Sequence, residues 1–233
     1  MSKNKISSLK ELGKILLKNE IVFEQFIQEV TVAVTEMFRD PDFYKTIRQK
    51  VIQHLSTYPF LKIWIAGCAT GEEVYSVAIL LKEEGLLDRS VIYATDINQK
   101  SLQAAKKGVF PMNFMKTYTA NYQKSFGENS FSNYYHSKFD SILMDKSLKQ
   151  NIVFSVHNLV TDQSFNEFQL IFCRNVLIYF NRELQNKVID LFHKSLCNFG
   201  FLGLGSKDIN HFEEAGNKFK IVDKEQRIFM KNG

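Results

Sequence analysis

Short apolar runs and longer helical stripes alternate along the chain from about residue 61 onward. Apolar runs of strand length occupy four segments, at 61–66, 91–95, 152–156 and 170–173. Segments at about 72–84 and 99–107 have helical periodicity, and Gly85 is expected to end the first of these helices. This alternation predicts a mainly parallel sheet flanked by helices, with ligands bound at the carboxyl ends of the strands.

The pattern in the last third of the chain completes this sheet. Asn181 is expected to cap the clearest helix, which carries an apolar stripe and should end at Gly200; the stripe consists of Leu184, Val188, Leu191, Phe192 and Leu196. Residues 201–204 should continue the sheet, and 219–222 with 227–230 should form a closing antiparallel pair. The fold class expected is therefore Rossmann-like α/β, with an antiparallel C-terminal strand.

Two regions depart from the alternation. Residues 1–36 are expected to form a short N-terminal helical segment, and Pro41 should open a further helix that ends before Pro59. Residues 108–150 are aromatic, basic and rich in turn residues, and they are too long for a simple connection. The sequence thus predicts one domain over 37–233 with a small subdomain inserted at about 108–150.

Composition limits the class of protein. The chain of 233 residues is 45% hydrophobic but has no apolar run of about 18 residues, so insertion into a membrane is not expected. Residues 1–5 are not followed by an apolar segment, which argues against a secretory signal. Three cysteines without metal-ligand spacing indicate reduced thiols, so we expect a cytoplasmic protein without a metal site.

The net charge of +5 is concentrated in one stretch. Residues 99–150 contain eight lysines against three acidic residues. Such a segment is either a solvated surface or a docking site for an acidic partner. Because the charge is modest and no nucleic-acid motif is present, a nucleic-acid partner is not expected.

A glycine-bracketed loop follows the first predicted strand. Gly67 and Gly71 enclose it, and a helix begins directly afterwards, which is the geometry that presents backbone N–H groups to a ligand. Glu72 and Glu73 stand where a phosphate would otherwise lie. Negative charge there suits a cationic ligand, so the loop favours S-adenosylmethionine over NAD or ATP.

Polar residues follow the next two strands. Asp96 ends the second strand and is either an acceptor for ribose hydroxyl groups or the N-cap of the following helix. After the third strand, Asn158 could contact an adenine edge and Leu159 could pack on the ring, although Asn in this position is also a common turn residue.

Arg174 comes directly after the fourth strand, and Tyr179 lies five residues further on. A guanidinium group at a strand end requires a carboxylate partner. That partner is either Glu72 or Glu73 within the protein, or a substrate carboxylate clamped with help from the tyrosine hydroxyl. Arg39 is either a further cation at the same site or a surface charge at a helix end.

Four sequence blocks together resemble the CheR-type chemotaxis receptor methyltransferases. They are Thr-Glu-Met-Phe-Arg-Asp-Pro at 35–41, Ala-Gly-Cys-Ala-Thr-Gly-Glu-Glu-Val-Tyr-Ser at 66–76, Ala-Thr-Asp-Ile-Asn at 94–98 and Phe-Cys-Arg-Asn-Val-Leu-Ile-Tyr-Phe at 172–180. The resemblance extends from about residue 7 to the C-terminus. It implies a class I fold and methyl esterification of glutamate side chains on receptor helices, with S-adenosylhomocysteine as the second product.

The resemblance also implies roles for individual residues. The cofactor pocket would contain the two loop glycines and further residues from all four blocks and from the segment after the third strand, namely Thr35, Arg39, Gly67, Gly71, Glu72, Asp96, Asn158, Leu159 and Arg174. Arg174, Tyr179 and Arg39 would serve the reaction on the substrate side, and the role of Glu73 is left open. The insertion would correspond to the small β-subdomain that docks a receptor tail peptide in some members.

Two other functions compete with this hypothesis. A methyltransferase fold retained as a non-catalytic cofactor-binding adaptor is favoured by the short N-terminal segment, because members of the family usually carry a complete helical domain there. A methyltransferase acting on small carboxylic acids would share the chemistry. The presence of both Arg174 and Tyr179 argues for catalysis.

Overall fold

The computed structural model describes residues 8–30, 35–125, 127–208 and 218–233. Its main sheet consists of β1 (Leu61–Ala66), β2 (Ser90–Asp96), β6 (Ile152–Val156), β7 (Phe168–Cys173), β8 (Leu196–Leu204), β9 (Phe219–Asp223) and β10 (Ile228–Lys231). The helices that flank it are α3 (Pro41–Thr46), α4 (Ile52–Ser56), α5 (Glu72–Glu83), α6 (Gln99–Lys107) and α9 (Arg182–Ser195). The expectation about a secretory signal concerns residues 1–5 and lies outside the described part of the chain.

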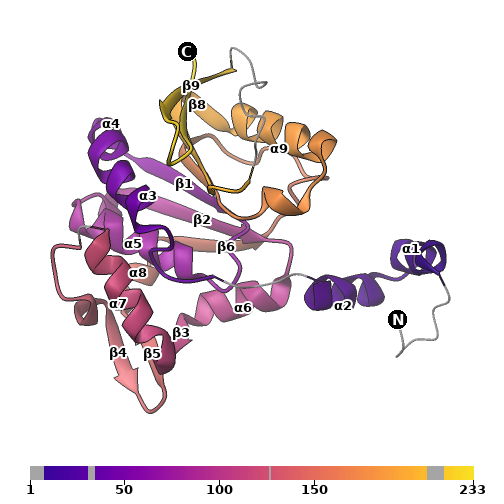
Figure 1. Ribbon diagram of the computed structural model, residues 1–233, viewed down its shortest axis with the longest axis horizontal. Coiled ribbons are helices and arrows are strands. Elements are labelled where there is room, and N and C mark those ends of the chain that lie inside the picture. Colours follow the sequence, from indigo (N-terminus) through magenta and orange to yellow (C-terminus); the bar gives the residue numbers. More distant parts are fainter. Residues whose placement is uncertain (1–7, 31–34, 126, 209–217) are drawn as a thin grey trace.

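The strand order of the main sheet is β6-β2-β1-β7-β8-β10-β9 (Figure 1). Strands β6, β2, β1, β7 and β8 pair in parallel, and β10 is antiparallel to both of its neighbours. The predicted Rossmann-like sheet with an antiparallel C-terminal strand is confirmed. From β1 the chain first adds β2 and β6 on one side of the sheet and then adds β7 and β8 on the other. The strand order therefore reverses at β1, and ligands bind at such a position in sheets of this kind.

One predicted boundary is wrong. The helix α9 ends at Ser195, and Leu196 already begins β8, which pairs with Phe168 of β7. The prediction placed Leu196 on the helical stripe and the helix end at Gly200, but Gly200 lies inside the strand. An apolar residue such as Leu196 fits the end of a helical stripe and the start of a buried strand equally well. Its pairing with β7 assigns it to the strand.

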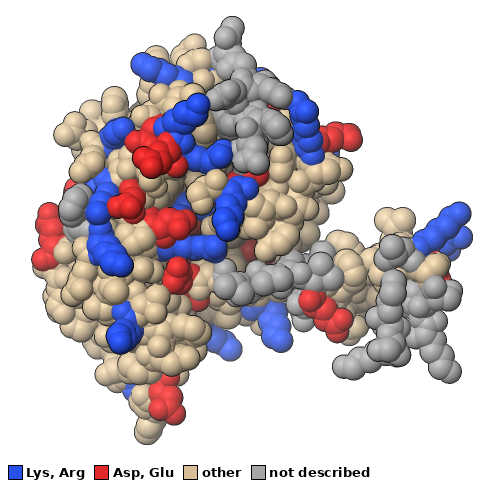
Figure 2. Space-filling model, viewed as in Figure 1, with Lys and Arg blue, Asp and Glu red and all other residues tan. Residues whose placement is uncertain are grey.

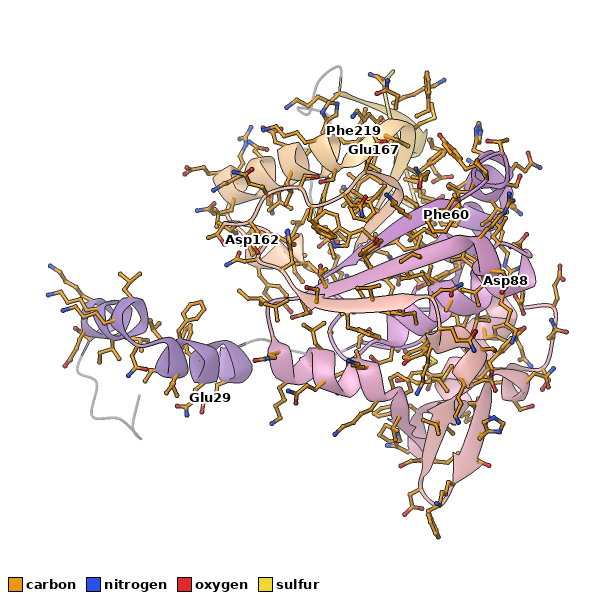
Figure 3. All side chains as sticks on the ribbon, turned by 180° about the vertical axis from the view of Figure 1, so that it is seen from behind. Glu29, Phe60, Asp88, Asp162, Glu167 and Phe219 are labelled. Atoms are coloured by element: carbon orange, nitrogen blue, oxygen red, sulfur yellow. The ribbon has the colours of Figure 1, made fainter. Side chains whose placement is uncertain are left out.

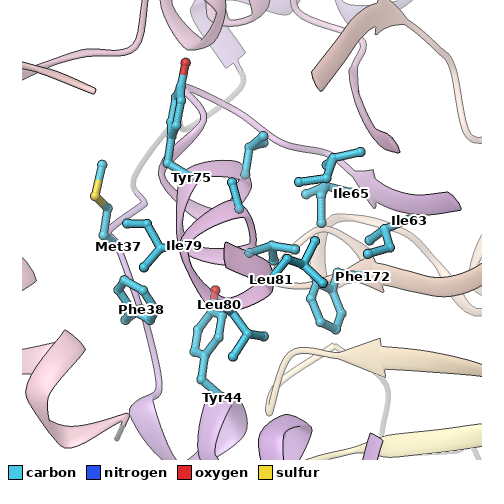
Figure 4. Close-up of a cluster of buried hydrophobic side chains, with 14 of the residues drawn as sticks. Met37, Phe38, Tyr44, Ile63, Ile65, Tyr75, Ile79, Leu80, Leu81 and Phe172 are labelled. Carbon is cyan, nitrogen blue, oxygen red and sulfur yellow. The ribbon is translucent and has the colours of Figure 1, made fainter. Parts of the chain in front are cut away.

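Alternating side chains of β1 divide the core into two layers. Leu61, Ile63 and Ile65 pack under α3, α4, α5 and α6, and the close-up in Figure 4 shows Ile63 and Ile65 beside Phe172 and Leu81. Trp64 points to the opposite face, where it packs with Phe168 and with Phe192 of α9. Figure 3 shows α9 on this second face, beside the loop that carries Asp162. The sheet is thus covered on both sides, as a parallel sheet requires.

The helix opened by Pro41 is interrupted but keeps its buried face. A π-helical turn, Ile47–Val51, joins α3 to α4. Phe43, Ile47, Val51 and Leu55 are all buried, as their spacing predicts. Upstream, α1 (Leu9–Lys18) and α2 (Glu20–Val30) contact each other and extend away from the sheet in Figure 1. Residues 1–7 and 31–34 of the predicted helical segment lie outside the described residues, and residues 35–36 are not helical.

The segment between α6 and β6 contains a second, smaller sheet. Its strands are β3 (Val109–Pro111), β4 (Tyr135–Lys138) and β5 (Ser141–Met144), in the order β3-β5-β4, and its helices are α7 (Met115–Lys124) and α8 (Lys146–Lys149). In Figure 1 these elements lie together below α5. The segment between α6 and β6 therefore forms a small sheet with two helices, in which β3 and β4 are the edge strands.

A buried carboxylate joins this segment to the main sheet's helices. The side chain of Glu83 on α5 is 1% exposed and accepts hydrogen bonds from Tyr122, from Tyr134 at 2.7 Å, and from Arg48. Burial raises the pKa of Glu83, but the hydrogen bonds from the two tyrosines and Arg48 outweigh it, so the pKa lies below its usual value. The Glu83 carboxylate thus links α5 to three other parts of the chain: α7, the turn before β4, and the helical segment that begins at Pro41.

Replacing Glu83 with glutamine should lower the free energy of unfolding by about 1–3 kcal/mol, since two tyrosine hydroxyls and one guanidinium lose a charged acceptor. Because the folded pKa is lowered, the contribution of Glu83 is complete above the unfolded pKa of about 4.3 and is lost as the pH falls through the folded pKa. Urea unfolding at several pH values measures both effects. The exposed Glu128→Gln variant should stay within about 0.5 kcal/mol of the wild type, and an equal loss in both variants would contradict the role of Glu83.

The surface is mixed in charge. Figure 2 shows basic and acidic side chains interspersed over one face, without a field of a single sign. Cys68, Cys173 and Cys197 are free and buried. None of the helices in the described residues has the length and apolar character needed to cross a membrane.

Candidate cofactor and substrate site

A cavity of about 430 Å³ opens at the carboxyl ends of β1, β2, β6 and β7. Eight of the ten predicted site residues line it: Thr35, Arg39, Gly67, Asp96, Asn158, Leu159, Arg174 and Tyr179. The other two, Gly71 and Glu72, lie next to it without lining it. Residues from four separate sequence blocks and from the segment after β6 therefore meet at one place.

The glycine loop is shaped by close packing. Gly67 and Gly71 have φ of +78° and +97°, a region that favours glycine. A Cβ atom on Gly67 would lie 2.4 Å from Cγ2 of Val176, and one on Gly71 would lie 2.8 Å from Cβ of Ala105. The N–H groups of Gly67 and Cys68 both donate to the Thr95 carbonyl, at 2.8 and 2.9 Å. The loop is thereby fixed against β2, α6 and the segment after β7.

Asp96 holds the loop to the second strand. Its Oδ2 accepts from the N–H of Ala69 and its Oδ1 from the N–H of Asn98, both at 2.8 Å. The alternative that Asp96 caps the next helix is wrong, because Asn98 is the N-cap of α6 and accepts from Ser101. Burial raises the pKa of Asp96, although these backbone N–H groups act in the opposite direction. Each carboxylate oxygen can accept a further hydrogen bond, so the group remains able to bind a ribose hydroxyl.

The two adjacent carboxylates of α5 have different surroundings. Glu72 is 7% exposed, and its oxygens accept from Thr70 at 2.6 Å and from Tyr118 at 3.4 Å. Burial raises the pKa of Glu72. Glu73, in contrast, lines the cavity. Glu72 does not line the cavity, since neighbouring positions on a helix point about 100° apart. The assignment of Glu72 to the cofactor remains a prediction.

Arg174 is enclosed by the protein. Its Nη1 donates to Glu73 at 2.7 Å, and its Nη2 donates to Asp40 at 2.7 Å and to the Arg39 carbonyl at 2.9 Å. The guanidinium carbon lies 4.2 Å from the centre of the Phe43 ring. The interpretation of Arg174 as an internal ion-pair partner of Glu73 is confirmed, and a substrate-facing role remains a prediction. Asp40, which lies 134 positions before Arg174 in the chain, was not anticipated as a partner.

Arg39 and Tyr179 complete the mouth of the cavity. Arg39 is half-buried, and Tyr179 is 63% exposed in a short 3₁₀ turn, Leu177–Tyr179, that precedes α9. These two residues and Arg174 come from the segment before α3 and the segment after β7. The structure therefore brings together the three residues predicted to serve the reaction.

The segment after β6 forms the remaining wall. The side-chain oxygen of Asn158 accepts from the N–H of Val160 at 2.9 Å, so its role as a turn residue is confirmed, and Leu159 is buried. His157 also lines the cavity, donates its backbone N–H to the Asp96 carbonyl at 3.2 Å and packs on Trp64. Apart from its position at a strand end, no sequence pattern indicated a role for His157.

The chemistry of this donor set fits a neutral or cationic ligand with hydroxyl groups. Carboxylates of Glu36, Glu73 and Asp96 line the cavity beside apolar Leu159, Ile97 and Val176. In the described part of the chain, no group of three His, Cys, Asp or Glu side chains could hold a metal ion. The site can thus bind an adenosine-bearing cation through acceptors and apolar contacts.

The chain resembles known proteins in sequence. The model of the CheR methyltransferase SAM-binding domain matches residues 33–228. A protein named Cher3 from Pseudomonas putida is 49% identical over 227 residues, which cover 97% of this chain and 82% of that protein. The chemotaxis protein methyltransferase of Listeria monocytogenes is 28% identical, over 88% of this chain and 76% of that protein. Among solved structures, the N-methyltransferase NodS from Bradyrhizobium japonicum is 12% identical, over 84% of this chain and 97% of that one, with a TM-score of 0.45.

Proposed function

Because the chain belongs to the CheR methyltransferase family, we propose that it methylates glutamate side chains of chemoreceptors, with S-adenosylmethionine as the methyl donor. The observation that carries this proposal is the single cavity that gathers eight of the ten residues expected from the family's motifs. Arg39 and Tyr179 at the cavity support catalysis over an adaptor function, because both can donate hydrogen bonds to a substrate carboxylate.

The proposed reaction requires orientation rather than a proton acceptor. When bound, S-adenosylmethionine would supply an electrophilic methyl group to a glutamate oxygen, and the electron pair of the broken sulfur–carbon bond would stay on sulfur to give S-adenosylhomocysteine. The substrate glutamate is already ionised at neutral pH, since its unperturbed pKa is about 4.3. Holding the two reactants in line can lower the barrier by roughly 7–11 kcal/mol.

The residues of the cavity divide into two groups in this proposal. Asp96 would accept from ribose hydroxyls, and Asn158 and Leu159 would contact the adenine. Arg39 and Tyr179 would orient the substrate carboxylate, because both line the cavity mouth and can donate hydrogen bonds. Arg174 would support the substrate side through Glu73 and the Arg39–Asp40 segment, to which it is bound.

Incubation with methyl-labelled S-adenosylmethionine and receptor-containing membranes should produce label that alkali releases as methanol, since carboxyl methyl esters are base-labile. Isothermal titration calorimetry with S-adenosylhomocysteine should detect binding to the isolated protein. Binding without transfer would support the adaptor function, and turnover of free carboxylic acids in place of receptor would support the small-molecule enzyme. Absence of S-adenosylhomocysteine binding would contradict the receptor methyltransferase, the adaptor and the small-molecule enzyme alike.

A receptor tail peptide is the partner proposed for the smaller sheet. Its strands β3 and β4 are edge strands, which present unpaired backbone groups to an extended peptide. Among the described residues, Tyr135–Lys138 of β4 pair with β5 on one side and with no strand on the other. A C-terminal receptor peptide should therefore bind the protein without competing with S-adenosylhomocysteine, because the two sites use different residues.

A further inference from the structure

The backbone that carries Tyr179 is held by side chains outside the cavity. Tyr179 is 63% exposed, so packing contributes little to the direction of its ring. Within its own turn, the N–H of Tyr179 donates to the Val176 carbonyl at 3.2 Å and the N–H of Phe180 donates to the Leu177 carbonyl at 3.0 Å. An isolated turn of this length is weak, because 3₁₀ hydrogen bonds have poor geometry. Its shape must depend on other contacts.

Gln185 on α9 supplies the first of these contacts. Its Nε2 donates to the carbonyl of Leu177 at 2.9 Å and to the carbonyl of Phe180 at 3.1 Å. These two carbonyls lie on either side of Tyr179 along the chain. The half-buried Gln185 side chain is fixed in turn by the start of α9, where Asn181 caps the helix and its carbonyl accepts from the N–H of Gln185 at 2.9 Å.

Asp208 fixes the other end of the same segment. It is 2% exposed, and its Oδ2 accepts from the N–H of Asn175 at 2.6 Å and from the N–H of Gly205 at 2.7 Å. Asn175 has a φ of +60°, a conformation that a non-glycine residue adopts only when its surroundings hold it there. The Asp208 carbonyl also receives the Gln185 amide at 3.4 Å, so the two residues form one connected support.

We propose that Gln185 and Asp208 are positioning residues, which hold segment 175–180 so that the Tyr179 hydroxyl faces the substrate carboxylate. This inference rests on the proposed function. Neither residue lines the cavity, so each acts through the backbone of the segment rather than on the reactants. Without them the Phe180 carbonyl and the Asn175 N–H would lose these partners, and the Leu177 carbonyl would keep only the Phe180 N–H. Backbone groups left without partners would turn toward water, and the segment would move.

The test uses Gln185→Met, which keeps the length of the side chain and removes its donors. We expect a fall in kcat of about 10- to 100-fold with little change in S-adenosylhomocysteine affinity, since small displacements of a positioning group can have effects of this size. Gln185→Glu should behave in the same way, because a carboxylate cannot donate to the two carbonyls. Gln53→Met makes the same chemical change at an exposed position of α4 and should leave kcat unaltered.

A double-mutant cycle separates positioning from a general loss of structure. If Gln185 acts through Tyr179, then adding Gln185→Met to Tyr179→Phe should cost little further activity, because the two changes remove one interaction. Additive losses, or a Gln185→Met variant with wild-type kcat, would overturn the proposal.

Amide hydrogen exchange tests whether Gln185 holds the segment without any measurement of methyl transfer. The amides of Tyr179 and Phe180 should exchange faster in Gln185→Met than in the wild type or in Gln53→Met. If the wild type transfers no methyl group, the proposed function fails while exchange still decides whether Gln185 holds the segment. Unchanged exchange of both amides would overturn the positioning role.

Discussion

Replacing Arg174 with alanine should reduce the free energy of unfolding by about 3–5 kcal/mol, which is the range found when one partner of a buried ion pair is removed. In a chain of this size the loss should lower the thermal midpoint by roughly 10 °C. Methyl transfer should be lost as well. Thermal or urea unfolding measures the first effect and the labelled-methyl assay the second.

The physical reason is the carboxylate that the substitution leaves behind. The side chains of Arg174 and Glu73 are 3% and 12% exposed, so Glu73 would keep a charge with little access to water. Asp40 is 45% exposed and can be solvated without its partner, so it adds less to the loss. The Arg39 carbonyl also loses its donor, which loosens the segment that brings Arg39 to the cavity.

Two further variants make this prediction sharp. Adding Glu73→Gln to Arg174→Ala should restore part of the lost stability, because it removes the unpaired charge. Lys218→Ala breaks an ion pair with Asp190 whose side chains are about half exposed, and it should cost at most about 1 kcal/mol. If Arg174→Ala abolishes transfer but unfolds like the wild type, Arg174 acts on the substrate alone.

Replacing Asp96 with alanine should weaken S-adenosylhomocysteine binding by about 2–3 kcal/mol, the contribution expected of hydrogen bonds to a charged group, or roughly 30- to 150-fold in Kd. The variant removes the proposed ribose acceptor and also releases the Ala69 and Asn98 N–H groups that shape the loop. Isothermal titration calorimetry measures the change directly.

Asp145 provides the matched control. Like Asp96, it accepts a backbone N–H at the start of a helix, from Ser147 at 2.9 Å, but it lies outside the cavity. Asp145→Ala should therefore bind S-adenosylhomocysteine as the wild type does. Equal loss in the two variants would indicate a general effect on folding, and an unaltered Kd in Asp96→Ala would exclude Asp96 from the cofactor site.

Local patterns were sufficient for most of the fold. The strands β1, β2 and β6 and the helices α5 and α6 were predicted to within one or two residues, because each is a continuous run with clear turn signals at its ends. The boundary between α9 and β8 was missed, because no turn residue separates them and Leu196 suits both. Pairing of β8 with β7 made that choice.

The sequence indicated the location of the site and most of its residues, but not how their side chains are arranged. Strand ends, a glycine loop and an acidic residue at the end of β2 indicated where a ligand binds, since parallel strands bring their carboxyl ends to one edge. The sequence could not distinguish Glu72 from Glu73, because the docking of α5 on the sheet decides which side chain faces the cavity. It also gave no sign that Gln185 and Asp208 support Tyr179.

The sequence by itself therefore determined the sheet, the loop and the types of residue around the cavity, because these depend on short-range periodicity and on conformations such as the positive φ of Gly67 and Gly71. Only the tertiary structure decided which charges pair. Arg174 meets Asp40 and Glu73 across 134 and 101 positions of the chain. Contacts at that separation are fixed by the packing of β7 against α3 and α5. The sequence offered Glu72 and Glu73 as alternative partners for Arg174 and did not indicate Asp40.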